Sequence, residues 1–173
     1  MIVIRNEPWQ VYERCSACFP EQSERAITFP RGPKICDVMF VGQAPSFDPK
    51  LRKRRPVLHC SKGSGAAKLF CDMLSELDYD SDSFYFTNLV KCSDLSLRKE
   101  GSRANCYQFF CQELKNVNPK RIVALGRKVE SFLKKHEITV PVCFSYHPAY
   151  LLRNAISRED YSQQLRNAIS GSY

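Results

Sequence analysis

No stretch of this 173-residue chain is apolar over the roughly 20 residues that a membrane-spanning helix needs. Its start, Met-Ile-Val-Ile-Arg-Asn-Glu-Pro, has neither the apolar segment nor the cleavage site of a secretory signal peptide. The cysteines number nine, and an odd set cannot all pair in disulfides within one chain. These absences argue against a membrane-spanning or disulfide-stapled secreted protein and predict a cytoplasmic one.

Length and composition are ordinary for a globular protein. Hydrophobic residues make up 43% of the chain and charged residues 25%. A chain of 173 residues can bury a core without disulfides or a second domain. We therefore expect a single domain over residues 1–173 that works as a monomer.

The charge balance is basic, with 26 lysines and arginines against 18 acidic residues and a formal net charge of +8. Much of the excess lies in the run Lys50-Leu51-Arg52-Lys53-Arg54-Arg55. A dense basic run suits a polyanion, with nucleic acid as the leading candidate. A basic surface that is merely solvated is the alternative, and charge alone does not separate the two.

Four apolar runs rich in β-branched or aromatic residues predict buried strands, at Asp37–Val41, Phe84–Val90, Arg121–Leu125 and Val140–Phe144. Helical spacing predicts helices at 64–77, 104–117 and 126–135, and a polar one at 159–169. Apolar strands that alternate with helices are typical of a parallel sheet covered on both faces. We therefore predict an α/β fold of three layers, α/β/α, with a central four-stranded parallel sheet.

The segments between these elements predict less regular structure. Residues 9–14 indicate a short helical turn. Residues 20–33, with three prolines and a glycine, indicate a loop or irregular arm. Residues 50–62 predict a basic loop, and the chain after Cys92 predicts a polar loop as far as Arg103.

Polar residues follow three of the predicted strands. Gly42-Gln43-Ala44-Pro45 with Asp48 follows the first, Thr87-Asn88 ends the second, and His147 follows the fourth. The carboxyl ends of parallel strands share one edge of the sheet, so these groups can converge on one pocket. Taken singly, Asn88 is explained by ending a strand, Asp48 by capping an element and Gly42 by a turn.

The last of these strand ends reads Ser-Tyr-His-Pro-Ala-Tyr-Leu-Leu-Arg, from Ser145 to Arg153. Pro148 ends the strand and constrains His147, so the histidine lies on a rigid turn. Two leucines and an arginine follow at once. Either this turn carries function, or His147 is satisfied within it and the leucines begin a helix facing the core.

Four cysteines have a spacing that suits a metal centre. Cys15 and Cys18 form a Cys-x2-Cys pair, while Cys92 and Cys106 come from distant elements. Four thiolates can hold zinc or an iron–sulfur cluster. The lack of a second Cys-x2-Cys pair favours the cluster. A redox dithiol at Cys15 and Cys18 is a weaker alternative. The other cysteines are expected to be packing residues, namely Cys36, Cys60, Cys71, Cys111 and Cys143.

Together these segments resemble the uracil-DNA glycosylase superfamily, and specifically its iron–sulfur branch, often called family four. Gly42-Gln43-Ala44-Pro45 resembles a Gly-Glu-Ala-Pro loop of that family, and Thr87 to Cys92 its Thr-Asn-x-Val-Lys-Cys segment. Residues 119–126 resemble its Pro-Lys-x-Ile-Val-Ala-Leu-Gly strand, and residues 147–153 its His-Pro-Ser-x-Leu-Leu-Arg motif. The motifs occur in the same order from Cys15 to Arg153.

The resemblance implies a doubly wound sheet, a 4Fe–4S cluster on Cys15, Cys18, Cys92 and Cys106, and removal of uracil from single- or double-stranded DNA. It places His147 and Asn88 as hydrogen-bonding partners of the uracil and Asp48 as the group that positions the attacking water. Gly42, Gln43, Ala44 and Val57 are expected to contact the base. For DNA it implies a wedge of Leu151 and Leu152 with Arg153, and phosphate contacts from Lys53, Arg54 and Arg55.

Several positions depart from the family pattern. Gln43 replaces a glutamate, Ala149 a serine, and Pro49 an acidic residue after Asp48. Val57 stands where the family commonly has a phenylalanine that stacks on uracil. The departures leave two alternatives to a monofunctional uracil-DNA glycosylase. One is a glycosylase of the same fold for hypoxanthine or xanthine, and the other is a catalytically weak iron–sulfur module that binds DNA.

Overall fold

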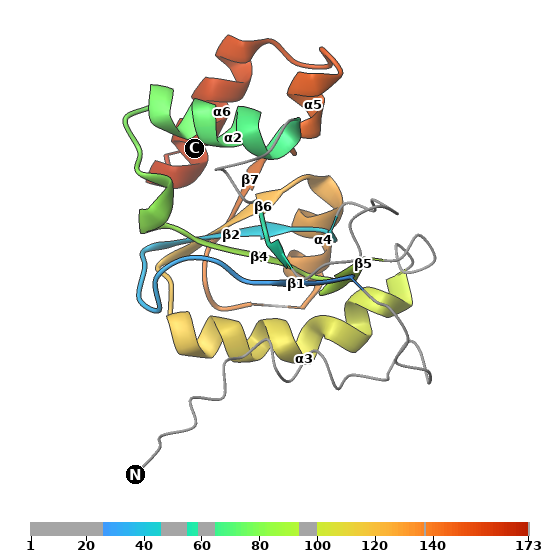
Figure 1. Ribbon diagram of the computed structural model, residues 1–173. Coiled ribbons are helices and arrows are strands. Elements are labelled where there is room, and N and C mark those ends of the chain that lie inside the picture. The colour runs from blue at the N-terminus through green and yellow to red at the C-terminus, as the bar shows by residue number, and fades with distance from the viewer. Residues whose placement is uncertain (1–25, 46–54, 59–64, 94–99, 137, 173) are drawn as a thin grey trace.

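The structure is a computed structural model that describes residues 26–45, 55–58, 65–93, 100–136 and 138–172 (Figure 1). At 26, 27, 55, 56, 93 and 100–103 it describes the backbone alone. Cys15, Cys18, Asp48, Lys53, Arg54 and Cys60, all named above, lie outside these ranges, and the same holds for the helical turn predicted at 9–14.

The centre of the fold is a sheet of four parallel strands, β2 (Val38–Gly42), β4 (Tyr85–Asn88), β6 (Arg121–Leu125) and β7 (Val142–Ser145). Their order across the sheet is β4-β2-β6-β7, and each neighbouring pair is parallel. The first of these strands along the chain therefore lies inside the sheet, and later strands are added on both sides of it.

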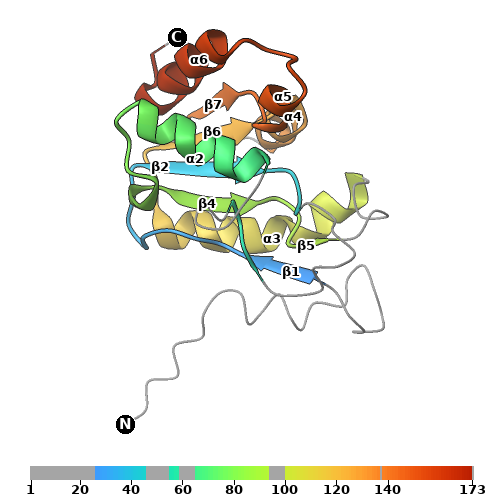
Figure 2. The same ribbon diagram turned by 45° about the horizontal axis from the view of Figure 1, so that its top comes forward.

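Helices cover both faces of this sheet (Figure 2). On one face, α2 (Ala66–Glu76) and α6 (Arg158–Ser170) pack against a cluster that includes Phe40 and Phe86. On the other, α3 (Glu100–Val117) and α4 (Arg127–Lys135) pack against a cluster that includes Met39 and Val41. Alternate residues of β2 thus serve opposite cores, as the pleat of a strand requires. The predicted three-layer α/β/α fold is confirmed.

A second, smaller sheet has the order β3-β1-β5. It consists of β1 (Ala26–Phe29), β3 (Arg55–Pro56) and β5 (Cys92–Ser93). The chain after β1 then runs along β4, because Arg31 and Phe86 exchange two backbone hydrogen bonds, of 3.0 and 2.7 Å. This arm covers the outer edge of the main sheet.

Two short helices complete the described elements, the 3-10 turn η1 (Ser81–Ser83) and α5 (Ala149–Leu152). The long elements lie close to their predicted positions, and β6 matches at both ends. Three predictions of irregular structure were wrong in part. Strand β1 lies within the predicted arm, β3 within the basic loop, and β5 and the start of α3 within the polar loop. These strands have only two to four residues each, too few to stand out in the sequence, and their pairing partners are distant.

The cysteines also required one correction. Cys36 and Cys143 are buried, as packing residues should be. Cys71, predicted to be another, is instead disulfide-bonded. Cys71 is only half-buried on α2, so its sulfur is accessible to a second thiol, unlike that of a fully buried packing residue. Among the helices that the structure describes, none has the length and apolar character needed to cross a membrane.

Candidate functional site

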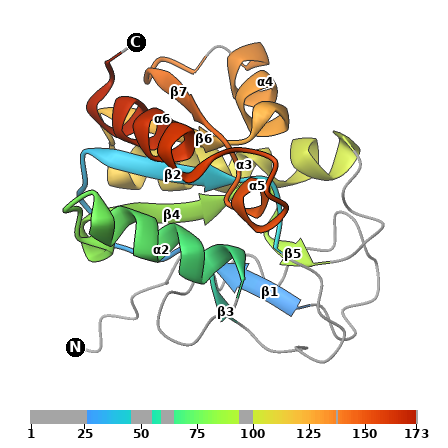
Figure 3. The ribbon, with the colours of Figure 1, turned by 90° about the horizontal axis from the view of Figure 1, so that it is seen from above.

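The candidate site lies at the carboxyl ends of the four parallel strands. In chain order the strands run β2, β4, β6, β7, so the direction of winding reverses between β2 and β6. In open α/β sheets the crevice at such a reversal is the usual ligand site. Helix α5 lies toward the carboxyl ends of the strands, on the side of the sheet that α2 and α6 cover (Figures 1 and 3).

Asn88 ends β4, an outer strand, and lies over Gly42, which ends the neighbouring inner strand β2. A Cβ atom built on Gly42 would be 2.3 Å from Oδ1 of Asn88. The carboxamide therefore occupies the space that any other residue at position 42 would fill. Asn88 is only 6% exposed, so its orientation is set by packing rather than by solvent.

The turn after Asn88 is tied to the end of β2 by backbone hydrogen bonds. The N–H of Leu89 donates to the carbonyl oxygen of Gly42 at 2.9 Å, and that of Val90 to Gln43 at 3.0 Å. Leu89 and Val90 are both buried. The Gly42–Gln43 segment and the Asn88 turn therefore form one rigid unit.

His147 follows β7, the outer strand on the other side, and its ring is fixed by the turn. The backbone N–H of Ala149 donates to Nδ1 of His147 at 3.1 Å. Because a backbone N–H can only donate, Nδ1 must accept, and the single proton of the neutral ring is on Nε2. Nε2 is therefore the atom of His147 that can donate to a ligand.

Burial lowers the pKa of His147, and the positive charge of Arg153 lowers it further. Both effects favour the neutral ring that the Nδ1 hydrogen bond requires. Tyr146, just before it, is held from α6, since its N–H donates to Oε1 of Gln164 at 3.1 Å. The histidine is thus presented as a neutral hydrogen-bond donor on a braced turn.

Gly126 directly follows the inner strand β6 and lies next to His147. Its φ of +105° favours glycine, and a Cβ atom on it would lie 3.7 Å from Cβ of His147. Its N–H donates to the carbonyl oxygen of Ser145 at 2.8 Å. Asn88 and His147 therefore occupy similar places, each beside a glycine at the carboxyl end of an inner strand, on either side of the winding reversal.

Leu151, Leu152 and Arg153 extend from the His147 turn on α5 and just after it. Leu151 is half-buried against the core, whereas Leu152 is 49% exposed and Arg153 is exposed. Tyr150, in the same helix, is also exposed. An apolar side chain and a cation thus protrude beside the site.

Comparison with known proteins shows the family to which the chain belongs. Residues 29–169, which include Asn88, His147 and both glycines, match the family model described as the uracil DNA glycosylase superfamily. The chain belongs to that superfamily.

Curated relatives narrow the resemblance. The type-4 uracil-DNA glycosylase of Archaeoglobus fulgidus is 27% identical over 158 residues, which cover 78% of this chain and 76% of the relative. That of Thermotoga maritima is 28% identical over 159 residues, covering 82% and 80%. That of Pyrobaculum aerophilum is 26% identical over 187 residues, covering 94% and 91%. The predicted family-four branch of the superfamily is confirmed.

The other residues predicted to contact the base differ in how deeply they are buried. Gln43 and Ala44 are half-buried in the loop after β2. Val57 is 4% exposed and packs in the cluster that contains Phe70, and its N–H donates to the carbonyl oxygen of Phe29 at 3.1 Å. For Arg55, the structure describes only the backbone, which lies in β3. Contact of these residues with a base or DNA stays a prediction.

Cys92 and Cys106 are the predicted metal ligands that lie within the described residues. Cys92 is in β5 and half-buried, Cys106 is in α3 and buried, and neither is in a disulfide. Among the described residues, no three histidine, cysteine or acidic side chains gather into a metal site. The described residues therefore include two of the four predicted ligands, Cys92 and Cys106. The other two, Cys15 and Cys18, lie outside the described residues.

The sequence did not single out a buried ion pair next to Asn88. Lys91 and Glu113 are 3% and 1% exposed, and Nζ lies 2.8 Å from Oε1 of the carboxylate. A weak signal was present, because Glu113 follows Phe109 and Phe110 at helical spacing on the inward face of its helix. Lysine and glutamate are normally surface residues, so the pattern alone did not pair them.

Proposed function

We propose that this protein is a DNA repair glycosylase that removes uracil from DNA and leaves an abasic site. The observation that carries the proposal is the placement of Asn88 and His147 on the two sides of the winding reversal. A carboxamide and a neutral imidazole N–H, both fixed, provide donors and an acceptor for the edges of a flat base.

The chemistry assigns a separate task to each side chain. The bond between C1′ of the sugar and N1 of uracil breaks, and the electron pair leaves with the base as an anion. Nε2–H of His147 donates to the uracil oxygen on which negative charge grows. The Asn88 carboxamide accepts from N3–H and donates to O4. Cytosine reverses that donor–acceptor order, so the same carboxamide excludes it.

Water supplies the new bond to C1′, and its proton needs an acceptor. Asp48 is proposed to position this water and take the proton. It follows the loop that begins at Gly42 and Gln43, although it lies outside the described residues. No lysine is proposed to form a Schiff base, so the enzyme is monofunctional.

The base must leave the stack before the site can reach it. Leu152, with Leu151 beneath it, is proposed to fill the vacated space, and Arg153 to hold a phosphate. Lys53, Arg54 and Arg55 are proposed to add phosphate contacts. The exposure of Leu152 and Arg153 beside His147 supports this arrangement.

A 4Fe–4S cluster is proposed as the cofactor, held by Cys15, Cys18, Cys92 and Cys106. The donor chemistry fits, because Cys92 and Cys106 are present as thiols on separate elements. When bound, such a cluster supplies metal–thiolate bonds that join distant segments of the chain. We also propose that the protein acts as a single-domain monomer in the cytoplasm.

A panel of oligonucleotides tests the activity. Single- and double-stranded DNA with one uracil, hypoxanthine, xanthine or thymine is incubated with the protein and then treated with alkali. Breakage at uracil is expected. Breakage only at hypoxanthine or xanthine would identify the same fold acting on another base, and binding without breakage would identify a DNA-binding module.

Two variants test the proposed roles of Asn88 and His147, and one assay tests the cluster. Asn88→Ala and His147→Ala are each expected to slow uracil release by about 100-fold or more, as loss of one fixed hydrogen-bond donor does in other enzymes. If both left the rate unchanged, the site would be misassigned. Pure protein should contain iron and acid-labile sulfide, and a colourless protein with zinc and no iron would overturn the cluster.

A further inference from the structure

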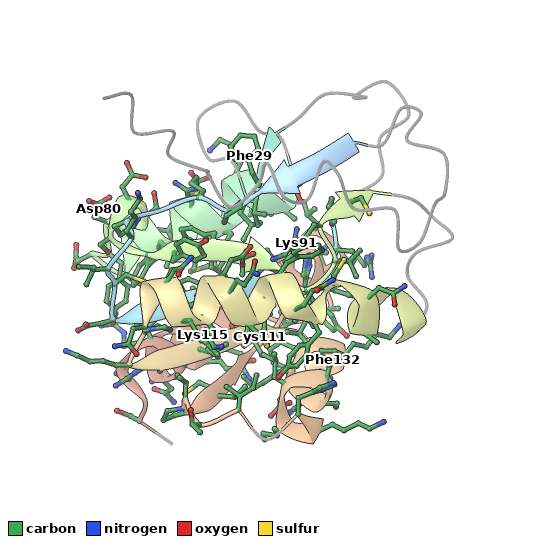
Figure 4. All side chains as sticks on the ribbon, turned by 90° about the horizontal axis from the view of Figure 1, so that it is seen from below. Phe29, Asp80, Lys91, Cys111, Lys115 and Phe132 are labelled. Atoms are coloured by element: carbon green, nitrogen blue, oxygen red, sulfur yellow. The ribbon has the colours of Figure 1, made fainter. Side chains whose placement is uncertain are left out.

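The buried pair of Lys91 and Glu113 lies directly behind the Asn88 turn. Figure 4, which looks onto α3, shows Lys91 beside this helix, where Glu113 is located. A buried charge pair usually contributes little net stability compared with apolar residues of the same size, because both charges lose their hydration. Its place in a core therefore calls for a role other than stability.

The contacts of the ammonium group point to that role. Nζ of Lys91 donates to Oγ1 of Thr87 at 2.7 Å and to the backbone carbonyl oxygen of Asn88 at 2.7 Å. It also donates to Oε2 of Glu113 at 2.9 Å. Two of these partners are the last two residues of β4, so the charge holds the strand end that carries the carboxamide.

Asn88 is therefore constrained from two directions. Its side chain lies against Gly42, and its backbone carbonyl is held by Lys91. The backbone carbonyl oxygen of Lys91 in turn accepts hydrogen bonds from N–H and Oγ1 of Thr28, at 2.8 and 3.2 Å. Helix α3, strand β4 and strand β1 meet at this one residue.

We propose that Lys91 and Glu113 are positioning residues, which fix the Asn88 carboxamide in the orientation that reads the uracil edge. The inference rests on the proposed function. Glu113 holds the ammonium in place, and the ammonium holds the turn. Neither residue needs to touch the base or the DNA.

The decisive experiment separates positioning from stability. Lys91→Met leaves a buried carboxylate without its partner, so its Tm is expected to fall by roughly 10 °C. The double variant Lys91→Met/Glu113→Leu removes both charges and is expected to regain most of that Tm. In single-turnover assays both variants are expected to release uracil at least tenfold more slowly than the wild type, and DNA affinity should stay within twofold.

Several results would overturn the proposal. One is a double variant that regains the rate together with Tm, because activity would then follow stability alone. A second is a rate loss that occurs only where iron is also lost. Thr87→Val, which removes one partner of the ammonium without a change of charge, should slow release by about threefold, and an unchanged rate would count against the proposal.

Epistasis with Asn88 gives the specific readout. In the Asn88→Ala background the charge-free pair should cause no further loss of rate, because residues that act through one group are not additive. An additional tenfold loss there would overturn the inference.

The exposed pair of Lys120 and Asp37, 2.9 Å apart at the opposite end of the sheet, is the matched control. Lys120→Met/Asp37→Asn should change neither rate nor Tm. A wild type that releases no uracil would instead overturn the proposed function.

Discussion

At the scale of single residues, the candidate site depends most on Gly42, the glycine at the end of β2. Gly42 leaves room for the Asn88 carboxamide, and Gly126 lies against His147. Asn88 ends one outer strand and His147 follows the other, and each lies beside one of these glycines. A side chain at position 42 would occupy the space of the Asn88 carboxamide.

Gly42→Ala is expected to slow uracil release by at least tenfold while lowering Tm by only a few degrees. The added methyl group would meet the movable end of the Asn88 side chain at 2.3 Å, so the carboxamide rotates away and the backbone stays in place. Single-turnover kinetics and thermal melting measure the two effects. In the Asn88→Ala background the substitution should cost nothing more, and a similar loss there would contradict this explanation.

The pH dependence of the reaction should reveal the influence of Arg153 on His147. Arg153 lowers the pKa of His147, so Arg153→Gln is expected to raise it toward its ordinary value. Protonation of Nδ1 breaks the hydrogen bond with Ala149, so activity falls as pH drops through that pKa. The acid limb of the single-turnover rate should therefore move to higher pH, measured at saturating DNA. A limb that does not move, or moves to lower pH, would contradict this assignment.

At the scale of elements, what the sequence predicts well is what local pattern determines. The strand at Arg121–Leu125 was predicted at both ends, because a buried β-branched run lies between a proline turn and Gly126. The small strands β1, β3 and β5 were missed, since each is four residues or shorter and pairs only with distant segments. The placement of Asn88 and His147 at strand ends was predicted from local pattern, whereas the Lys91–Glu113 pair depends on packing between β4 and α3, which no local pattern records.

Helix α6 braces the His147 turn, so its own start should matter. Oγ of Ser157 accepts a hydrogen bond from the N–H of Asp160 at 3.0 Å, which satisfies one of the unpaired groups of the first turn. Ser157→Ala should lower the free energy of unfolding by about 1 kcal/mol. Urea denaturation measures this, with Ser162→Ala, in the interior of the same helix, as the control. An equal loss in both variants would argue against the capping role.

At the scale of the whole molecule, the net charge of +8 should dominate binding to DNA. The affinity of the slowed Asn88→Ala variant for uracil-containing DNA is expected to fall linearly on a log–log plot against salt. Arg153→Gln should reduce the magnitude of that slope by about 1, because one phosphate contact is lost. Lys120→Gln, the same charge change at the far end of the sheet, should leave the slope unchanged. Equal effects of the two would place the DNA elsewhere.

The arm that runs along β4 affects how the protein loses activity and aggregates when it is heated. The backbone of Arg31 pairs with the N–H and carbonyl oxygen of Phe86, which could otherwise pair with a strand of another molecule. Thr28 donates two hydrogen bonds to the carbonyl oxygen of Lys91, beside the Asn88 turn. Detachment of this one segment would thus loosen the Asn88 turn and expose an unpaired edge of the sheet at the same time. Loss of activity and the onset of light scattering should therefore coincide in a thermal ramp, and inactivation should become irreversible as soon as it begins.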